Sequence, residues 1–259
     1  MKAVILAGGL GTRMREETEF RPKPMVEIGG MPVLWHIMKL LSHQGIKDFV
    51  ILTGYKGEVI TNFFAQLPIL RRHMHFDYTL PTPNRHSSGG PDEDWRVDVL
   101  ATGTDTPTAE RLLQARDIIG TEPFICTYGD GLADVDIAQL VDGHIRSGKV
   151  GTMTVVQPSN RFGVVDISAD GSVKSFREKP RMTDWINIGY FVFGDRIFSY
   201  LDEQQMLEEE PLKKLAKDGQ LRANKHSGFW EPMDTFREYQ HLNELWKRNE
   251  APWAIWNQT

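Results

Sequence analysis

The stretch Met1–Arg13 reads MKAVILAGGLGTR and joins a short apolar run to a turn that has three glycines in four positions. The run Ala3–Leu6 is rich in strand-forming residues, and the glycines after it end the run, which predicts a buried first strand. Tightly folded glycines expose several backbone N–H groups in one direction, and such a concavity binds anions, phosphate above all. The stretch therefore predicts a strand followed by a phosphate-binding loop; a glycine turn without a ligand is the alternative.

Strand-like and helix-like segments alternate downstream of this loop. Apolar spacing predicts helices over Val33–Gln44 and Val59–Leu67, and we expect strands at Asp48–Leu52 and His73–Leu80. Residues 81–94 are rich in Pro, Gly, Ser and charge, which predicts a loop. The β-α-β-α-β order predicts an α/β fold: a Rossmann-like, mostly parallel mixed sheet with helices on both faces.

The second part of the chain has a more mixed pattern. Asp170–Gly171 between two extended segments is a strong hairpin signal. No convincing linker interrupts the chain, so we expect a single domain over residues 1–259, with a wound α/β half at 1–150 and a mixed α+β half at 151–259. The remaining expected strands are Trp95–Thr102, Pro123–Thr127, Gly151–Val156 and Ile186–Phe193, and the remaining expected helices are Ala109–Ile119, Val135–Ser147, Glu209–Lys217 and Thr235–Lys247.

Composition argues against several classes of protein. The chain has 30 Lys and Arg against 35 Asp and Glu, a net charge of −5, so it has no basic field for binding nucleic acid or a membrane. Its single cysteine, Cys126, excludes an intramolecular disulfide and argues against a Cys-based zinc site. No stretch approaches the roughly 18 apolar residues of a membrane-spanning helix. We therefore expect a soluble, cytoplasmic protein.

Cations follow the glycine-rich loop closely. Arg13 closes the loop, and Arg21 and Lys23 come soon after it, with a proline on each side of Lys23. Two better-known phosphate loops do not fit: the dinucleotide fingerprint needs a glycine where Met14 stands, and the Gly-Lys-Ser/Thr of the Walker pattern occurs nowhere. The cations therefore favour a phosphate site of a different kind.

An aspartate between two glycines, Asp130, follows the expected strand at 123–127. Ligands of open α/β sheets bind at that edge of the sheet, and a carboxylate facing a phosphate loop suits Mg²⁺. An ordinary turn aspartate is the alternative. We expect the nearby Asp134 and Asp136 to cap a helix rather than to bind a ligand.

Three further charged segments are weak signals by themselves. Glu178 and Lys179 end a hairpin strand, where they could form a surface ion pair. Asp234 stands directly before an expected helix, which it could cap. The acidic run 208–210 is typical of a solvated helix start.

Taken in order, the motifs LAGGLGTR, RPKPMVEIGG, YGDG and FREKP, with the late Asp234, resemble the nucleoside-diphosphate-sugar pyrophosphorylases, the sugar-1-phosphate nucleotidylyltransferases. Finer segments such as TYGDGLADVDI and GFWEPMDT resemble the branch that converts CTP and glucose 1-phosphate into CDP-glucose and pyrophosphate for deoxysugar and O-antigen-type polysaccharides. The resemblance covers almost the whole chain. It implies a nucleotide-diphospho-sugar transferase fold, a nucleotidyltransferase activity with Mg²⁺ as cofactor, and a homo-oligomer.

The same resemblance implies roles for individual residues. Arg13, Lys23 and Asp130 would be catalytic, Asp130 and Asp234 would hold Mg²⁺, and Glu178 and Lys179 would bind the sugar phosphate in a second half that also carries oligomer contacts. CTP would be bound by the glycine-rich segment 6–13 and by three other positions, that is by Leu6, Ala7, Gly8, Gly9, Leu10, Gly11, Thr12, Arg13, Lys23, Thr106 and Arg111.

The sequence departs from the branch at two places. Ala109–Glu110 precede Arg111 where Gly-Gly is usual, and side chains there could crowd or re-aim the contacts to the base. A second glycine is also usual in the segment Asn187–Gly189, close to the sugar. The choice of base is therefore left open, and the same fold with another nucleotide or sugar phosphate is the nearest alternative.

Two rival classes are disfavoured by particular residues. A NAD-dependent sugar oxidoreductase lacks support because the third glycine of its fingerprint is missing. A non-catalytic regulatory subunit that only binds sugar nucleotides is disfavoured because the charged residues of all four motifs are intact.

The expected chemistry is an in-line attack of the sugar phosphate on the α-phosphorus of the nucleotide. A phosphate is already ionised near neutral pH, since its second pKa is about 6, so no general base is needed. No histidine lies in the motifs, and His226 comes nearest. Four tryptophans near the C-terminus are expected to dock either on the core or at an oligomer interface: Trp230, Trp246, Trp253 and Trp256.

Overall fold

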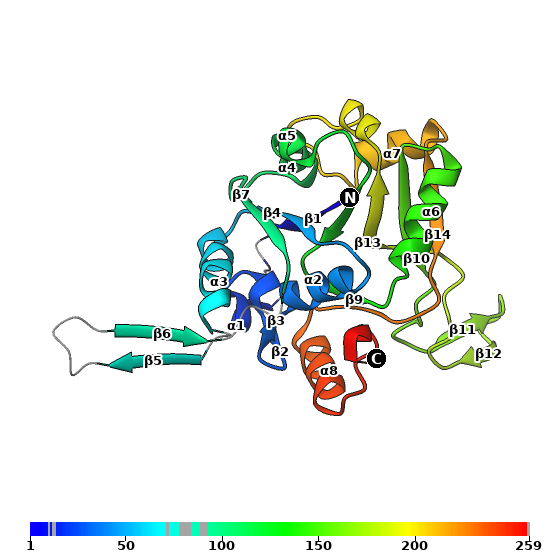
Figure 1. Cartoon of the computed structure of the whole chain (residues 1–259). Helices are drawn as coiled ribbons and strands as arrows, with labels where there is room; N and C mark the ends of the chain where they lie inside the picture. Colours follow the sequence, from blue (N-terminus) through cyan, green and yellow to red (C-terminus); the bar gives the residue numbers. More distant parts are fainter. Residues whose placement is uncertain (10, 12–13, 71–72, 78–83, 89–92, 258–259) are drawn as a thin grey trace.

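A seven-stranded sheet forms the centre of the computed structural model, which describes residues 1–9, 11, 14–70, 73–77, 84–88 and 93–257 (Figure 1). The strands lie in the order β14-β10-β13-β8-β1-β4-β7. Only β13 runs antiparallel to its neighbours, β8 and β10, within this sheet. The strands are β1 (Lys2–Ala7), β4 (Asp48–Thr53), β7 (Arg96–Ala101), β8 (Phe124–Tyr128), β10 (Gly151–Val156), β13 (Ile186–Phe193) and β14 (Leu221–Lys225).

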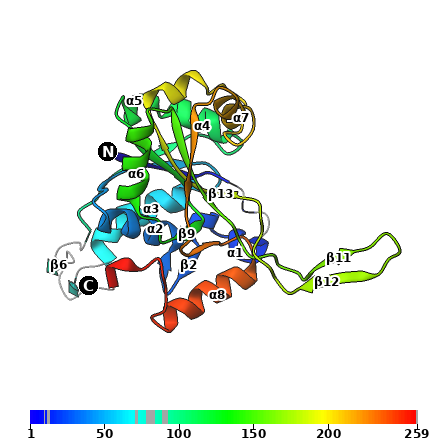
Figure 2. The ribbon, with the colours of Figure 1, turned by 90° about the vertical axis from the view of Figure 1, so that its right-hand side faces the viewer.

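Helices cover both faces of the sheet, and small two-stranded sheets surround it (Figure 2). The β11–β12 hairpin projects from the body of the molecule. The helices are α1 (Arg15–Thr18), η2 (Lys23–Met25), α2 (Val33–His43), α3 (Gly57–Leu70), α4 (Thr108–Gln114), α5 (Arg116–Ile119), α6 (Ile137–Ser147), η3 (Asp195–Ser199), α7 (Glu210–Lys217), α8 (Phe236–Lys247) and η4 (Ile255–Asn257). The small sheets pair β2 (Glu27–Ile28) with β3 (Met31–Pro32), β5 (His73–Asp77) with β6 (Asn84–Ser88), β9 (Gly131–Ala133) with β15 (Trp230–Pro232), and β11 (Val164–Ile167) with β12 (Val173–Arg177).

Alternate residues of β1 enter two separate apolar clusters, one on each face of the sheet. Ala3, Ile5 and Ala7 pack with residues of α2, α6 and α8, whereas Val4 and Leu6 pack with residues of α4, α5 and α7. A strand buried on both faces has to be apolar throughout, which is why the unbroken apolar run predicted a central strand correctly. The expected mostly parallel α/β sheet is confirmed.

The segment 73–94 differs from the expectation in two ways. The expected strand at 73–80 is present over residues 73–77, but it lies outside the central sheet, and residues 84–88 of the expected loop form a strand. Residues 73–77 and 84–88 form the hairpin β5–β6 outside the central sheet, and β7 is the third parallel strand on that side. In the sequence HMHFD of β5, polar and apolar residues alternate, so one face of the strand is polar. A central parallel strand is buried on both faces, which this sequence does not allow.

The four C-terminal tryptophans dock on this subunit's own core, which confirms the first of the two expectations for them. Trp253 is fully buried, and its Nε1–H donates to Nδ1 of the buried His36 over 3.3 Å. Trp246 and Trp256 lie against the same histidine ring, and Trp230 packs on the core cluster that contains α2. The C-terminal residues thus close the face of the sheet that carries α2.

No helix in the described ranges combines the length and the apolar character that crossing a membrane requires.

Candidate active site

A cavity of about 560 Å³ opens at the carboxyl ends of β1 and β8, the edge where open α/β sheets bind ligands. The residues after β1 form one wall, and the turn after β8 forms the floor. A smaller cavity of about 200 Å³ adjoins it and shares Tyr128, Asp130 and Asp234 with it. The other residues of the larger cavity include Leu6, Ala7, Gly8, Gly9, Gly11, Lys23, Thr106 and Arg111, all of which sequence analysis had placed at the nucleotide.

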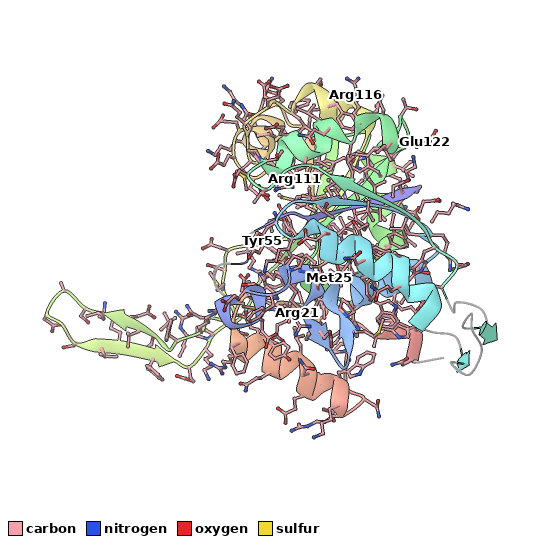
Figure 3. All side chains as sticks on the ribbon, turned by 90° about the vertical axis from the view of Figure 1, so that its left-hand side faces the viewer. Arg21, Met25, Tyr55, Arg111, Arg116 and Glu122 are labelled. Atoms are coloured by element: carbon pink, nitrogen blue, oxygen red, sulfur yellow. The ribbon has the colours of Figure 1, made fainter. Side chains whose placement is uncertain are left out.

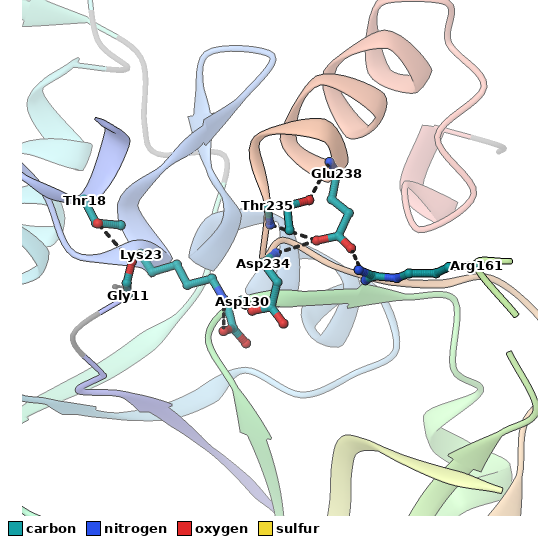
Figure 4. A network of polar contacts seen from close by, with 8 residues as sticks. All are labelled: Gly11, Thr18, Lys23, Asp130, Arg161, Asp234, Thr235 and Glu238. Atoms are coloured by element: carbon teal, nitrogen blue, oxygen red, sulfur yellow. Dashed lines mark hydrogen bonds and ion pairs between the residues drawn. The ribbon is translucent and has the colours of Figure 1, made fainter. Parts of the chain in front are cut away.

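Lys23 lies at the centre of the polar contacts in the larger cavity (Figure 4). Its Nζ donates to the Oδ2 of Asp130 over 2.7 Å and also to the Oδ1 of Asp234. The lysine side chain is nine-tenths buried, while the two carboxylates are about one-quarter and one-third exposed. The structure therefore brings together three charged residues that are 107 and 211 positions apart in the chain.

The charge of Lys23 is stabilised by these two partners. Burial alone would lower the pKa of the ammonium, because it removes the charged form from water. The attraction and hydrogen bonds of Asp130 and Asp234 outweigh burial, and the pKa of Lys23 is raised above its ordinary value. The residue is thus a permanent cation at neutral pH.

Local backbone geometry sets the position of Lys23. It begins the single turn η2, and the prolines before and after it, Pro22 and Pro24, restrict the backbone on both sides. Met25 donates its N–H to the carbonyl of Pro22 over 2.8 Å. Gly129, in the turn after β8, lies close to Pro24: a Cβ at position 129 would be 2.9 Å from Cγ of Pro24. A glycine at position 129 therefore lets the turn that carries Asp130 approach Lys23.

Asp234 does not cap the helix that follows it. The N-cap of α8 is Thr235, which forms a capping box with Glu238. Glu238 accepts hydrogen bonds from the N–H groups of Asp234 and Thr235, each over 2.9 Å, and pairs with Arg161 over 2.8 Å. The helix start is therefore satisfied without the Asp234 carboxylate, which contacts Lys23 instead; the expectation of a simple cap is wrong.

The two carboxylates fit a Mg²⁺ ion by the chemistry of their donors. Their oxygens converge on one ammonium group, which occupies the position that a cation between them would take. No group of three or more His, Cys, Asp or Glu that could hold a metal was found among the described residues. Mg²⁺ usually takes one or two carboxylates together with phosphate oxygens and water, so two carboxylates beside a phosphate site suffice.

Arg111, labelled in Figure 3, lines the larger cavity although it is almost fully buried. Its guanidinium donates to the carbonyls of Gly8, Thr53 and Thr104 over 2.9 to 3.3 Å and to Oγ1 of Thr102 over 2.5 Å. Burial lowers the pKa of this guanidinium from its usual value. A Cβ at position 8 would lie 2.2 Å from Cζ of Arg111, so the loop can rest on the arginine only because residue 8 is glycine.

The departure Ala109–Glu110 does not enter the cavity. Ala109 is fully buried in the core, and its N–H donates to the carbonyl of Gln205 over 3.1 Å. The Glu110 carboxylate accepts from the N–H of Gln204 over 3.1 Å. Both residues therefore attach α4 to the segment before α7, and neither side chain crowds the space above Gly8.

Several expected site residues lie elsewhere or outside the described residues. Glu178 and Lys179 are exposed, pair with each other over 3.9 Å and line neither of these two cavities. Arg21 pairs with two glutamates outside the larger cavity. Leu10, Thr12 and Arg13 lie outside the described residues.

The two aspartates that were expected to cap a helix, Asp134 and Asp136, have different roles. Asp136 caps α6 as expected, accepting from the N–H of Gln139 over 2.8 Å. Asp134 does not cap it; its Oδ1 lies 3.0 Å from Nε2 of His226. This contact is the largest cause of the raised pKa of the His226 imidazole. His226 is thereby attached to Asp134 and lines neither of these two cavities.

Tyr128 and Glu208 are two cavity residues that were not predicted from the sequence. The Tyr128 hydroxyl donates to the Glu208 carboxylate, and both line the larger cavity. Tyr128 stood in the TYGDG motif, which was a usable signal. Glu208 was assigned to a solvated helix start, and its position above Tyr128 depends on a contact over 80 residues that no local pattern reveals.

Comparison with known proteins shows which family the chain belongs to. Residues 2–247 match the nucleotidyl transferase family. The chain belongs to that family. It is 46% identical over 259 residues to the glucose-1-phosphate cytidylyltransferases of Salmonella typhi and Salmonella typhimurium, covering 99% of this chain and 100% of each relative.

Structural comparison supports the family fold. The structure of HddC from Yersinia pseudotuberculosis aligns with a TM-score of 0.68 at 24% identity, covering 95% of this chain and 99% of that one. This likeness concerns the fold, which is the mostly parallel mixed sheet described above. Together with the full-length relatives, it confirms the resemblance drawn from the sequence motifs, and the chain is a nucleotidyltransferase.

Proposed function

We propose that this nucleotidyltransferase joins CTP and α-D-glucose 1-phosphate into CDP-D-glucose and pyrophosphate. The names of the two full-length relatives support these substrates. The observation that carries the proposal is that two cavities, of about 560 and 200 Å³, share Asp130 and Asp234; the larger is assigned to the nucleotide and the smaller to the sugar phosphate. The α-phosphorus of CTP and the attacking oxygen of the sugar phosphate would meet at Asp130 and Asp234, the wall that the two cavities share.

The proposed reaction needs positioning and charge neutralisation rather than a proton acceptor. The sugar phosphate is ionised near neutral pH, since its second pKa is about 6, and its oxygen attacks the α-phosphorus in line. Among the described residues, no histidine lines either of the two cavities. Lys23, with its raised pKa, is the cation available to the phosphates at this wall.

Asp130 and Asp234 would hold Mg²⁺ once the phosphates enter. The ion would supply further neutralisation of the negative charge that develops between the two substrates. Lys23 would then exchange its contacts with the two carboxylates for contacts with phosphate oxygens. Arg13 is proposed to assist Lys23, in accord with the family signature LAGGLGTR.

The remaining roles follow the family resemblance. Glu178 and Lys179 are proposed to bind the sugar phosphate, which requires the end of the β11–β12 hairpin to approach the smaller cavity. The product is proposed to serve deoxysugar and O-antigen-type polysaccharide synthesis in the cytoplasm. The enzyme is proposed to be a homo-oligomer, which its mass measured by light scattering will test against the 29.6 kDa of one chain.

The direct test is product formation from purified protein, CTP, glucose 1-phosphate and Mg²⁺. We expect release of pyrophosphate and a nucleotide sugar with the mass of CDP-glucose. A reaction without the sugar phosphate is the control for CTP hydrolysis and should release no pyrophosphate. Absence of CDP-glucose from a folded protein would contradict the proposal.

A further inference from the structure

The wall of the larger cavity carries a carboxylate that the charge-neutralising chemistry does not use. Glu208 lines this cavity, but its hydrogen-bond partners are Tyr128 and Thr108 rather than members of the Lys23 cluster. A negative charge in a cavity that receives a triphosphate is unfavourable unless it meets a hydrogen-bond donor of the ligand. The position of Glu208 therefore needs an explanation.

Glu208 is held in place by two residues from different elements. Tyr128, at the end of β8, donates its hydroxyl to Oε1, and Oγ1 of Thr108, at the start of α4, donates to Oε2 over 3.0 Å. Thr108 in turn accepts the N–H of Leu207 over 2.7 Å, which fixes the segment that carries Glu208. Burial, followed by the nearby Glu208, raises the pKa of Tyr128, so its hydroxyl keeps the proton that it donates.

The carboxylate can still accept further hydrogen bonds. An ionised carboxylate has about four acceptor positions, and Tyr128 and Thr108 occupy two of them. Two other residues of the cavity already use their donors, since Thr106 donates to the carbonyl of Thr102 over 2.5 Å and Arg111 donates to backbone carbonyls and to Oγ1 of Thr102. This part of the cavity therefore favours a ligand edge that presents N–H groups.

We infer that Glu208 is the residue that selects cytosine, by accepting a hydrogen bond from the N4 amino group of CTP. Carboxylates accept from this amino group in nucleic-acid recognition. Uracil and thymine present the O4 carbonyl at the same position, so a carboxylate would face a second acceptor. The inference rests on the proposed function, because it assumes that CTP is the substrate.

The test is the ratio of kcat/KM for CTP to that for UTP, measured in the wild type and in Glu208→Gln. Glutamine keeps an acceptor for Tyr128 and adds an amide donor that can pair with O4 of uracil. We expect the CTP:UTP ratio to fall by roughly 10- to 100-fold in Glu208→Gln, the range that one mismatched polar contact produces. Part of the change should be a gain in kcat/KM for UTP.

Two variants separate base reading from a structural role. Glu209→Gln removes the same charge from a neighbouring residue outside the cavity and should leave the ratio unchanged. Tyr128→Phe removes one support of Glu208, so a merely structural role predicts that Tyr128→Phe and Glu208→Gln lower the rates with CTP and UTP equally. If the wild type prefers CTP and the CTP:UTP ratio is unchanged in Glu208→Gln, the inference about Glu208 is overturned and the proposed function still holds. Wild-type protein that showed no preference for CTP would overturn both.

Discussion

Lys23 illustrates which part of a site can be predicted from the residues alone. The two prolines around it and its place after the glycine-rich loop indicated a fixed cation, and the structure agrees. Its partners Asp130 and Asp234 come from the turn after β8 and the segment before α8. Before the structure, only the resemblance to a family predicted that Asp130 and Asp234 share a site. Contacts between residues 107 and 211 positions apart leave no local pattern in the sequence.

Replacing Asp130 should stop turnover without unfolding the protein. In Asp130→Asn, the amide cannot neutralise Lys23 or hold a cation as a carboxylate does, so kcat should fall by roughly 100- to 1000-fold. Pyrophosphate release at saturating substrates and Mg²⁺ measures the effect. Asp136→Asn, which changes the exposed cap of α6, is the matched control and should keep kcat within about twofold, as surface substitutions usually do. Near-wild-type turnover in Asp130→Asn would remove this residue from the site.

The two lysines are expected to affect different kinetic constants. Lys23 lies where charge shifts during transfer, so Lys23→Ala should chiefly lower kcat, by roughly 100-fold or more. Lys179→Ala should chiefly raise KM for glucose 1-phosphate, because the contact it loses is similar in the ground and transition states. Initial rates over a matrix of both substrates separate these effects. A rise in KM for CTP alone in Lys179→Ala would reverse the assignment of Lys179.

At the scale of elements, the sequence predicted most helices and strands, including the polar helices α7 and α8 and the exposed hairpin β11–β12. Strands β10 and β13 begin and end where the sequence indicated. Strand β14 was missed because its sequence LRANK has little apolar character, as befits an edge strand. The expected helix 109–119 is two helices, α4 and α5, with Ala115 between them.

Helix α4 gives a prediction about the departure from the usual Gly-Gly. Ala109 is buried and its N–H is bonded to Gln205, so it cannot read the base. Ala109→Gly should therefore lower the free energy of unfolding by about 0.5 to 1 kcal/mol, the cost of glycine in a helix, and change kcat/KM for CTP only modestly. Urea unfolding and steady-state kinetics measure the two quantities. A large shift in base preference would show that this turn does contact the nucleotide.

At the scale of the whole molecule, the last 30 residues return to the face of the sheet where α2 lies. The His36 ring joins both parts: its Nε2–H donates to the carbonyl of Ile28 over 2.8 Å, and its Nδ1 accepts from Trp253. The helical spacing of α2 predicted its buried face, but nothing in the sequence indicated that tryptophans more than 200 positions away would cover that histidine. The described fold therefore depends on its C-terminal segment.

This arrangement makes stability depend on pH. Burial lowers the pKa of His36 from 6.5 to about 4, so the folded protein favours the neutral ring. Between these two values the unfolded chain binds more protons, and the free energy of unfolding should fall as pH decreases from about 6.5 to about 4. The contribution of this one group is on the order of 3 kcal/mol at most. It is fully present above pH 6.5 and lost below pH 4.

Urea unfolding at a series of pH values, in the wild type and in His36→Gln, measures that contribution. Glutamine can donate and accept hydrogen bonds but does not titrate, so the variant should show a shallower pH slope in this window. The exposed His43→Gln is the matched control and should keep the wild-type slope. Equal slopes in all three proteins would contradict a neutral His36 in the folded state.

The most direct test of the proposed activity is a competition among nucleotides in one reaction. Equimolar CTP, UTP, dTTP, ATP and GTP are incubated with glucose 1-phosphate, Mg²⁺ and the enzyme, and the nucleotide sugars are separated and quantified at early times. We predict that CDP-glucose accounts for nearly all of the product, with UDP-glucose and dTDP-glucose far below it. A product mixture led by any other nucleotide would contradict the cytidylyltransferase assignment, although the enzyme would still be a nucleotidyltransferase.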